Sequence, residues 1–222
     1  MALETLEGTT GPHPVVSIIV LHGLGADGND FVPVAQQLDL RPVGHVRYIF
    51  PHAPVRAVTL NGGARMRAWY DIASLELSQR EDETGLRQSR LDVQALIDRE
   101  VERGVAAERI VLMGFSQGCA MTLLTGLRAP QRLAGLVGLS GYLPLAAMTA
   151  SERTAANSHT PIFMAHGRHD PIVQPALGTI SRDALRALGH EVEWHDYPME
   201  HAVCAEEISD LNRWLLKVLV PA

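Results

Sequence analysis

The 222-residue chain has only two cysteines, no excess of basic residues and no long apolar run. The separation of Cys119 and Cys204 fits neither a redox pair nor a zinc-ligand motif, so two reduced thiols are the simpler interpretation. A formal net charge of −6 and a pI of about 5.9 lack the basic character that binding to a phosphate backbone requires. We therefore expect no nucleic-acid partner.

The first residues lack both the basic start and the apolar run of a secretory signal. The longest apolar stretches, Val15–Leu21 and Trp214–Val220, are each interrupted by one polar residue and are far shorter than the ~20 residues that span a bilayer. We expect a cytoplasmic protein without a membrane span. At 46% hydrophobic content the chain can bury a full core, which predicts one domain over residues 1–222, with residues 1–14 as an N-terminal extension or edge strand.

Short apolar runs alternate with longer amphipathic segments, which is typical of a mostly parallel central sheet flanked by helices. The runs are nearly continuous in apolar residues, as buried parallel strands are. The predicted strands are Val15–Leu21, Val46–Phe50, Arg109–Met113, Leu133–Leu139, Pro161–His166 and Glu191–Tyr197. The predicted helices include Leu86–Arg103, Pro175–Leu188 and a last one that begins near Ala205. Thr59–Thr84 has no clean period, and such a long irregular segment predicts a functional rim.

The run Gly114-Phe115-Ser116-Gln117-Gly118 follows a predicted strand and precedes a helical segment, Cys119 to Arg128. This is the G-x-S-x-G motif in the strand–turn–helix setting that a nucleophile elbow requires. A sharp turn strains the serine backbone, and only small flanking residues let strand and helix approach so closely. We expect Ser116 to be a nucleophile and the Gln117 N–H to face a developing oxyanion.

A serine nucleophile needs a base, and the base needs a carboxylate to orient it. In folds with this elbow the chain order is Ser, then Asp or Glu, then His. Asp170 and His201 each follow a predicted strand in that order, and we expect them to complete a triad. The rivals Asp196 and His195 lie within a predicted strand, on opposite faces of the sheet.

Two other features bear on binding chemistry. The segment His22-Gly23-Leu24-Gly25 follows an early strand, and beside an elbow its best interpretation is oxyanion donation from the Leu24 N–H. It lacks the G-K-[ST] ending of a phosphate loop and the G-x-G-x-x-G spacing of a dinucleotide site. A metal site built from His166 and His169 lacks a third ligand, so the chain predicts neither metal nor cofactor.

Several motifs, in order, resemble the phospholipase/carboxylesterase family, which includes bacterial carboxylesterases and acyl-protein thioesterases. They are His22–Gly25, Asn61-Gly62-Gly63, Trp69-Tyr70-Asp71, Gly114–Gly118, His169-Asp170-Pro171 and Tyr197–His201. The resemblance runs from about Val15 to Leu219 and implies an α/β-hydrolase without a large lid domain. It implies a triad of Ser116, Asp170 and His201, with oxyanion donors at Leu24 and Gln117.

The resemblance also implies hydrolysis of short to medium acyl esters, a class of small-molecule partner. A role as acyl-protein thioesterase or lysophospholipase is the alternative within enzymes, and a non-catalytic ligand-binding protein of the same fold is the alternative from another class. The resemblance also suggests a homodimer, whereas one core accounts for all the predicted apolar faces here. The sequence therefore leaves the oligomeric state open.

Two departures from the family pattern stand next to the predicted triad. Cys119 replaces a second glycine after the Ser-Gln-Gly run, and Glu200 replaces a glycine before the histidine. Cys119 is small enough for the helix, whereas the effect of the Glu200 carboxylate on the imidazole stays open.

A set of large apolar residues predicts a short groove for the acyl chain. Its members are Leu24, Met66, Trp69, Leu75 and Val173. Packing of the loop onto the domain is an equally good interpretation of Trp69 and Leu75 taken singly. Together they predict a preference for acyl chains of about four to six carbons, since each buried methylene adds roughly 0.8 kcal/mol until the groove is full.

Overall fold

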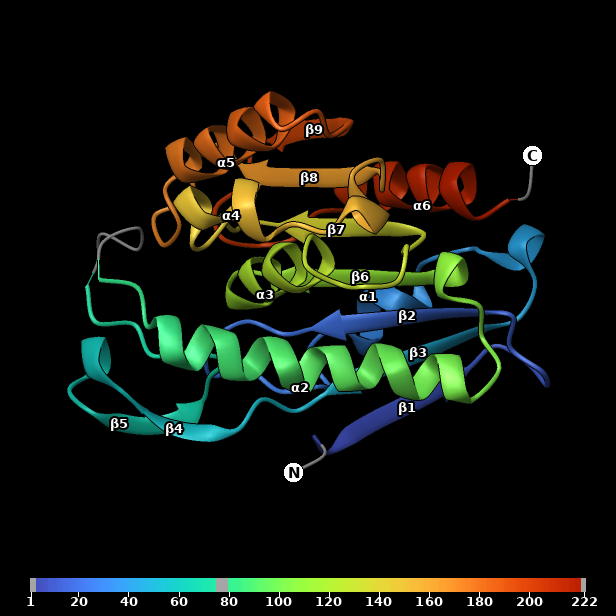
Figure 1. Cartoon of the computed structure of the whole chain (residues 1–222), viewed down its shortest axis with the longest axis horizontal. Helices are drawn as coiled ribbons and strands as arrows, with labels where there is room; N and C mark the ends of the chain where they lie inside the picture. Colours follow the sequence, from blue (N-terminus) through green and yellow to red (C-terminus); the bar gives the residue numbers. More distant parts are fainter. Residues whose placement is uncertain (1–2, 75–79, 221–222) are drawn as a thin grey trace.

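A computed structural model describes residues 3–74 and 80–220, and a seven-stranded sheet forms its centre (Figure 1). The strands lie in the order β1-β3-β2-β6-β7-β8-β9, in which β1 is antiparallel to β3 and every other neighbouring pair is parallel. Their bounds are β1 Thr5–Thr9, β2 Val16–Leu21, β3 Val46–Pro51, β6 Ile110–Phe115, β7 Gly135–Leu139, β8 Ile162–Gly167 and β9 Val192–Tyr197. The carboxyl ends of the parallel strands therefore meet at one edge, where ligands bind in open α/β sheets.

Helices cover both faces of this sheet, which explains why β2, β7 and β8 are buried along their whole length. Helices α2 (Glu83–Glu102), α3 (Gln117–Gly126) and α5 (Pro175–Ala187) pack on one face, and α1 (Val32–Gln36) and α6 (Ala205–Leu219) pack on the other (Figure 1). A short helix, α4 (Ala146–Glu152), lies after β7. The predicted α/β-hydrolase architecture is confirmed, and the described residues contain no large lid domain.

Helix α2 shows how local chemistry sets an element's start and buried face. The carboxylate of Asp82 accepts a hydrogen bond from the Gly85 N–H at 2.9 Å, which begins the helix one turn before the predicted start. Val93 and Ile97 are fully buried as predicted, whereas Val101 is 39% exposed. The apolar stripe of α2 therefore ends one turn earlier than the sequence pattern indicated.

The segment predicted to be irregular begins with the turn and second strand of a β-hairpin whose first strand precedes it, so that prediction is wrong for residues 59–67. Strands β4 (Val55–Val58) and β5 (Ala64–Arg67) pair antiparallel, joined by a short 3-10 helix, Thr59–Asn61. Gly62 and Gly63 form the tip, with φ of 65° and 81°. The Asn61-Gly62 pair is a hairpin-turn signal, but the strands are mostly exposed and too short to show a period.

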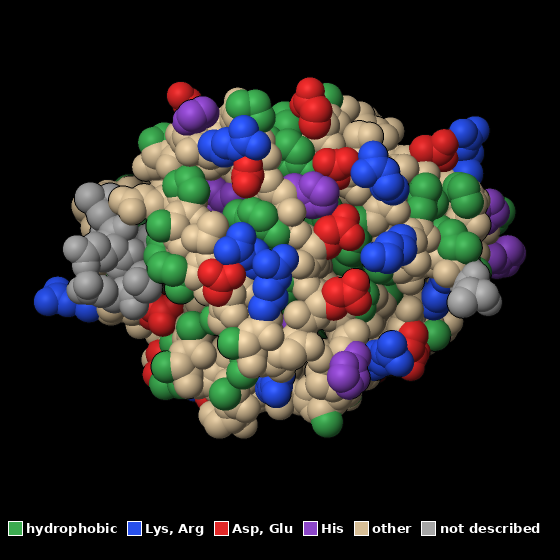
Figure 2. Space-filling model, turned by 90° about the horizontal axis from the view of Figure 1, so that it is seen from above, with side chains coloured by type: hydrophobic (Ala, Val, Ile, Leu, Met, Phe, Trp, Pro, Cys, Tyr) green, Lys and Arg blue, Asp and Glu red, His purple; other side chains and the backbone are tan. Residues whose placement is uncertain are grey.

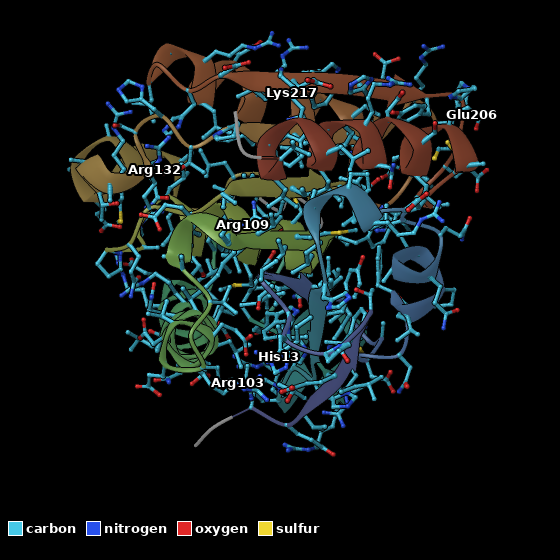
Figure 3. The ribbon with its side chains drawn as sticks, turned by 90° about the vertical axis from the view of Figure 1, so that its right-hand side faces the viewer. His13, Arg103, Arg109, Arg132, Glu206 and Lys217 are labelled. Carbon is cyan, nitrogen blue, oxygen red and sulfur yellow. The ribbon has the colours of Figure 1, made fainter. Side chains whose placement is uncertain are left out.

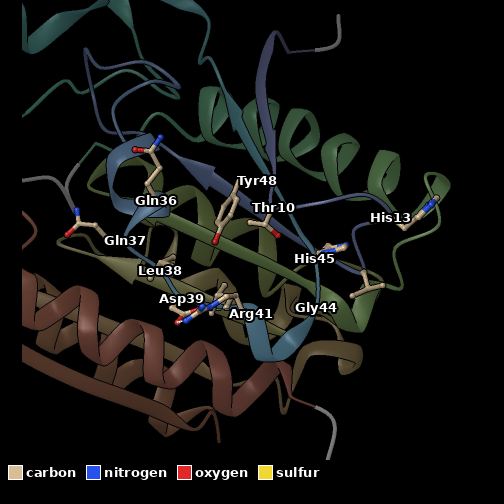
Figure 4. Close-up of a pocket in the computed structure, with 12 residues that line it drawn as sticks. Thr10, His13, Gln36, Gln37, Leu38, Asp39, Arg41, Gly44, His45 and Tyr48 are labelled. Carbon is tan, nitrogen blue, oxygen red and sulfur yellow. Dashed lines mark hydrogen bonds and ion pairs between the residues drawn. The ribbon is translucent and has the colours of Figure 1, made fainter.

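A hollow of about 720 Å³ opens beside the edge strands, with Thr10, Leu38 and Tyr48 among its walls (Figure 4). Its walls also include Val15 and His45, which immediately precede β2 and β3. It therefore lies at the amino-terminal ends of the parallel strands. Figure 3 views that end of the molecule, where the Arg109 guanidinium donates to the carbonyls of Val43 and Leu219.

The side over α5, β9 and α6 carries interspersed acidic and basic side chains (Figure 2). Ion pairs such as Arg213–Asp210, at 2.9 Å, contribute to this mixture. Within residues 3–74 and 80–220, no helix combines the length and the apolar character needed to cross a bilayer.

Candidate active site

Ser116 occupies the tight turn between β6 and α3. Its backbone has φ 56° and ψ −117°, a left-handed conformation that costs a non-glycine residue on the order of 1–3 kcal/mol. The Ser116 N–H donates to the Leu139 carbonyl at 2.9 Å, which holds the turn against the end of β7. The serine is partly exposed, so its hydroxyl is accessible at the carboxyl edge of the sheet.

The glycines on either side of Ser116 are required by the packing of this turn. A Cβ on Gly114 would lie 2.1 Å from the Gly118 carbonyl oxygen, and one on Gly118 would lie 2.0 Å from the Leu21 carbonyl oxygen. Real Cβ atoms do not approach backbone oxygens so closely, and backbone cannot yield as a flexible side chain can. The spacing of the G-x-S-x-G motif thus has a direct steric cause in the structure.

Asp170 and His201 lie together in the loops that follow β8 and β9. The His201 Nδ1–H donates to Asp170 Oδ2 at 2.7 Å, and the Asp170 side chain is fully buried. The two loops pack tightly, because a Cβ on Gly167 would lie 2.2 Å from the Glu200 carbonyl oxygen. The carboxylate thus orients the imidazole, and that bond leaves Nε2 as the free ring nitrogen.

The His201 imidazole packs against Phe115, with 4.6 Å between the ring centroids. Since Phe115 directly precedes Ser116, this contact brings His201 next to the elbow. Only 16% of the His201 side chain is exposed, so solvent reaches one limited part of it. The structure therefore gathers all three predicted triad residues at one edge of the sheet.

The rival pair on β9 is engaged elsewhere. His195 Nε2 lies 3.1 Å from Glu193 and its Nδ1 lies 3.4 Å from Asp210. The Asp196 carboxylate accepts from the Arg168 guanidinium. His195 and Asp196 thus make separate contacts with other partners.

The loop after β2 runs alongside the nucleophile. A Cβ on Gly23 would lie 3.4 Å from Ser116 Cβ, so Gly23 contacts the nucleophile turn. Leu24 is the next residue along this loop. His22 fixes this loop, because its Nδ1–H donates to the Gly23 carbonyl at 2.7 Å and its Nε2 accepts from the Ala53 N–H at 3.0 Å. Burial lowers the pKa of His22, which keeps the ring neutral in the tautomer that these two bonds require.

The two predicted oxyanion donors occupy suitable backbone positions. Gln117 is the first residue of α3, where an N–H has no carbonyl one turn back to bond. Leu24 is partly exposed in the loop, and the next residue is anchored by the Gly25 N–H, which donates to the Arg67 carbonyl at 2.8 Å. The oxyanion-donor roles of Leu24 and Gln117 stay predictions.

The side chain of Gln117 has a role that the sequence reasoning missed. Its Oε1 accepts from the Trp69 N–H at 3.0 Å, and its Nε2 donates to the Tyr70 carbonyl at 2.9 Å. These two bonds attach the segment after β5 to the first turn of α3. The signal in the sequence was a buried polar residue at a helix N-terminus, which must find partners.

Trp69 is a core residue in the structure. Its side chain is fully buried, and its indole N–H donates to the His22 carbonyl at 2.9 Å. Val173 is also buried, at 3% exposure, with its N–H donating to Asp170 Oδ1. In this structure neither residue offers open surface to an acyl chain, which favours the packing interpretation for Trp69.

Met66 and Leu24 are the predicted groove residues that remain partly exposed. A Cβ on Gly25 would lie 3.8 Å from the Met66 sulfur, so β5 reaches the loop that carries Leu24. Leu75 lies outside the described residues. The exposed apolar surface near Ser116 thus comes from Leu24 and Met66 among the predicted set.

The two departures from the family pattern lie in different surroundings. Cys119 is fully buried, and burial raises the pKa of its thiol to about 12, so it stays protonated and unreactive. A Cβ on Gly141 would lie 2.4 Å from Cys119 Cβ, which shows how closely the loop after β7 passes. Glu200 is exposed to solvent. The described residues contain no group of three or more His, Cys, Asp or Glu side chains that could hold a metal ion.

Comparison with known proteins agrees with this geometry. Residues 6–219 match the phospholipase/carboxylesterase family. The chain is 42% identical to acyl-protein thioesterase 1 of Mycosarcoma maydis, over 95% of this chain and 94% of that protein. It is 40% identical to acyl-protein thioesterase 1 of Yarrowia lipolytica, over 90% of each chain.

A solved structure shows the same similarity in three dimensions. The crystal structure of Zea mays acyl-protein thioesterase 2 superposes with a TM-score of 0.85 at 30% identity, covering 97% of this chain and 99% of that one. A fold, a nucleophile turn and a family match that covers nearly the whole sequence all agree. The chain belongs to the phospholipase/carboxylesterase family of α/β-hydrolases and is a hydrolase.

Proposed function

We propose that the protein hydrolyses carboxylic esters of short to medium acyl chains through Ser116, His201 and Asp170. The observation that carries this proposal is the 2.7 Å bond from His201 to the buried Asp170, beside a serine held in a strained turn. A neutral imidazole fixed in this way can accept the Ser116 proton during attack on the acyl carbon. It then returns the proton to the departing alcohol, which leaves an acyl-enzyme.

Water completes the cycle by the same route. His201 removes a proton from water, the hydroxide attacks the acyl-enzyme, and the carboxylic acid leaves as Ser116 recovers its proton. The N–H groups of Leu24 and Gln117 stabilise the oxyanion in both steps. One such donor contributes on the order of 10²–10³-fold to kcat in related chemistry.

A fluorophosphonate probe tests the nucleophile directly. We expect stoichiometric labelling of Ser116, with labelling and esterase activity both lost in Ser116→Ala, by on the order of 10³-fold or more in kcat/KM. The fold should be unchanged, because a partly exposed turn loses one oxygen atom, and circular dichroism and thermal melting would check this. A folded wild-type protein whose Ser116 does not react would favour a ligand-binding protein of the same fold instead.

A second candidate is removal of acyl groups from thioester-linked proteins, which the names of the similar proteins favour. The same atoms would carry it, because a thiolate replaces the alkoxide as leaving group. Comparing kcat/KM for an oxygen ester and a thioester with the same acyl group would separate the two. A preference for an S-acylated peptide over both the matched peptide ester and a lysophospholipid would support the thioesterase.

A further inference from the structure

His166, the penultimate residue of β8, is buried beside Asp170 and takes no part in the steps above. It is 1% exposed. Its Nε2 lies 2.8 Å from the Val173 carbonyl oxygen and 3.3 Å from Asp170 Oδ2. Both oxygens are acceptors, so Nε2 must carry the ring proton. Burial lowers the pKa of His166, which keeps it a neutral imidazole with one N–H at neutral pH.

Four N–H groups therefore surround the Asp170 carboxylate. Oδ1 accepts from the backbone N–H groups of Ile172 and Val173 at 2.8 and 2.9 Å. Oδ2 faces two imidazoles, that of His201 at 2.7 Å and that of His166 at 3.3 Å. The backbone bonds fix one oxygen, and the two histidines approach the other, so the carboxylate can rotate little.

We propose that His166 is a positioning residue, which holds Asp170 Oδ2 toward His201 by sharing its Nε2–H between that oxygen and the Val173 carbonyl. This inference rests on the proposed function, since it concerns the carboxylate of that triad. Through the Val173 carbonyl, His166 also closes the loop that carries Asp170. His166 thereby fixes both the direction and the charge of the group that orients the base.

The residues that pack around His166 restrict its imidazole to one position. A Cβ on Gly178 of α5 would lie 2.5 Å from His166 Nδ1, so any larger residue would displace the imidazole. On β9, the Trp194 ring stacks beside it, at 6.3 Å between centroids. The glycine and the tryptophan together confine the imidazole beside Asp170.

Few charges face this cluster. Asp170 and His201 contact it through their loops, the Arg182 guanidinium of α5 lies over the Trp194 ring at 5.1 Å from its centroid, and Glu200, next to His201 in the sequence, is exposed. Loss of the N–H donor at Nε2 of His166 therefore affects the Asp170 carboxylate before any other charged group.

This arrangement has a measurable consequence for pH dependence. The His166 N–H draws part of the negative charge of Oδ2 away from His201. Without that donor, Asp170 would attract a protonated His201 more strongly, because an unshared carboxylate favours the charged imidazole. The acid limb of the kcat/KM profile would then move to higher pH, while a less well fixed carboxylate would lower kcat.

The test compares His166→Gln with His166→Met. The two side chains have nearly the same shape, but only glutamine presents an N–H donor at the position of Nε2. We expect His166→Met to lower kcat about tenfold with little change in KM, since misdirected groups cost turnover rather than binding. We also expect its acid limb to move up by about half a pH unit. His166→Gln should recover most of both, and equal behaviour of the two variants would overturn the proposal.

Two measurements keep the proposal testable if His166→Met does not fold. In the wild-type protein, nitrogen-15 NMR at pH 7.5 should show His166 with a protonated Nε2 and a bare Nδ1, assigned by comparison with His166→Gln. The opposite tautomer would overturn the proposal without any activity assay. Gly178→Ala, whose Cβ would lie 2.5 Å from Nδ1, should displace the imidazole and move the acid limb, and an unchanged limb would count against the proposal.

Failure of this inference is distinguishable from failure of the proposed function. If Ser116→Ala removes activity but the His166 variants do not differ, the triad stands and His166 is only a packing residue. If Ser116→Ala retains activity, the proposed function fails, whatever the tautomer of His166.

Discussion

The nucleophile turn and the tip of the β4–β5 hairpin differ in how much of their geometry is imposed by neighbours. At the turn, added Cβ atoms on Gly114 and Gly118 would lie within 2.1 Å of backbone oxygens. At the hairpin tip, Cβ atoms on Gly62 and Gly63 would meet nothing within 4 Å. The nucleophile turn is thus held by close packing, whereas the hairpin tip has room to vary. A fold of this kind can change its substrate without disturbing its chemistry.

The largest difference between the two regions should appear when the activity and thermal stability of Gly118→Ala are compared with those of Gly63→Ala. The first forces the backbone of the elbow away from Leu21, so we expect kcat/KM to fall on the order of 10²-fold or more, with a loss of several degrees in Tm. The second meets no atoms and suffers only from its positive φ, at a cost of roughly 1 kcal/mol, with activity within about threefold of wild type. Ester hydrolysis and thermal melting of the two variants provide the check. Comparable losses in both would show that packing does not distinguish the two regions.

The next prediction concerns Glu207, a fully buried residue in the first turn of α6, shortly after His201. Burial raises the pKa of Glu207 to about 8, from 4.5 in the unfolded chain, and neither of its carboxyl oxygens has a hydrogen-bond partner among the described residues. The folded state therefore holds the proton more tightly than the unfolded state. The stability that this carboxyl contributes is fully present below about pH 4.5 and is lost as the pH rises toward 8, at about 1.4 kcal/mol per pH unit.

Glu207→Gln keeps the shape of the side chain and removes its charge. We expect it to equal the wild type near pH 4.5 and to exceed it by up to roughly 4 kcal/mol in free energy of unfolding at pH 8. Urea unfolding at pH 5, 7 and 8.5 would measure the difference. Glu206→Gln is the matched control, because Glu206 is exposed in the same turn. A difference between Glu207→Gln and wild type that does not change with pH would contradict the assignment of a buried, uncharged carboxyl group.

These contrasts also explain what the sequence could predict. The elbow was predictable because a strained serine between strand and helix demands glycines at fixed positions. Asp170 and His201 were predictable because strand ends in a parallel sheet fall at one edge. The nucleophile turn and the pairing of Asp170 with His201 thus leave traces in residue type and spacing.

The second layer around those residues was not predictable in the same way. The contact of His166 with Asp170 depends on the path of a loop, and the bonds of the Gln117 side chain depend on residues 47 and 48 positions away. Trp69 was predicted among groove residues because a large aromatic near a binding rim has no sequence mark that separates core from surface. Its full burial and its hydrogen bond to the His22 carbonyl are both defined only by the folded chain.

A smaller effect, on acyl-chain preference, is expected at the β4–β5 hairpin, where Met66 of β5 faces the loop that carries Leu24. Met66→Ala removes apolar volume that is only partly buried, so the groove should lengthen and the fold should be little affected. We expect the optimum of kcat/KM over a nitrophenyl ester series to move from about butyryl or hexanoyl toward longer chains, with changes of a few fold at each length, since each methylene contributes roughly 0.8 kcal/mol. Arg65→Ala, on the same strand, is the control for a general loosening of the hairpin. An unchanged preference in Met66→Ala would mean that the acyl chain binds elsewhere.

The smallest expected effect belongs to Glu200, the exposed carboxylate beside His201. A carboxylate near an imidazole favours its protonated form, so Glu200→Gly should move the acid limb of the kcat/KM profile to lower pH. Because Glu200 is exposed, water and salt screen it, and we expect a shift of about 0.3 pH unit or less at low ionic strength, vanishing near 1 M salt. The closer carboxylate, Asp170, is buried and should show no such salt dependence through its bond to His201. Profiles of wild type and Glu200→Gly at two salt concentrations would decide the matter. A shift that persists at high salt would mean that Glu200 acts through loop geometry, since a glycine there also frees the backbone that packs on Gly167. In that case Glu200→Gln, which removes the charge but keeps a side chain, would leave the acid limb where it is in the wild type.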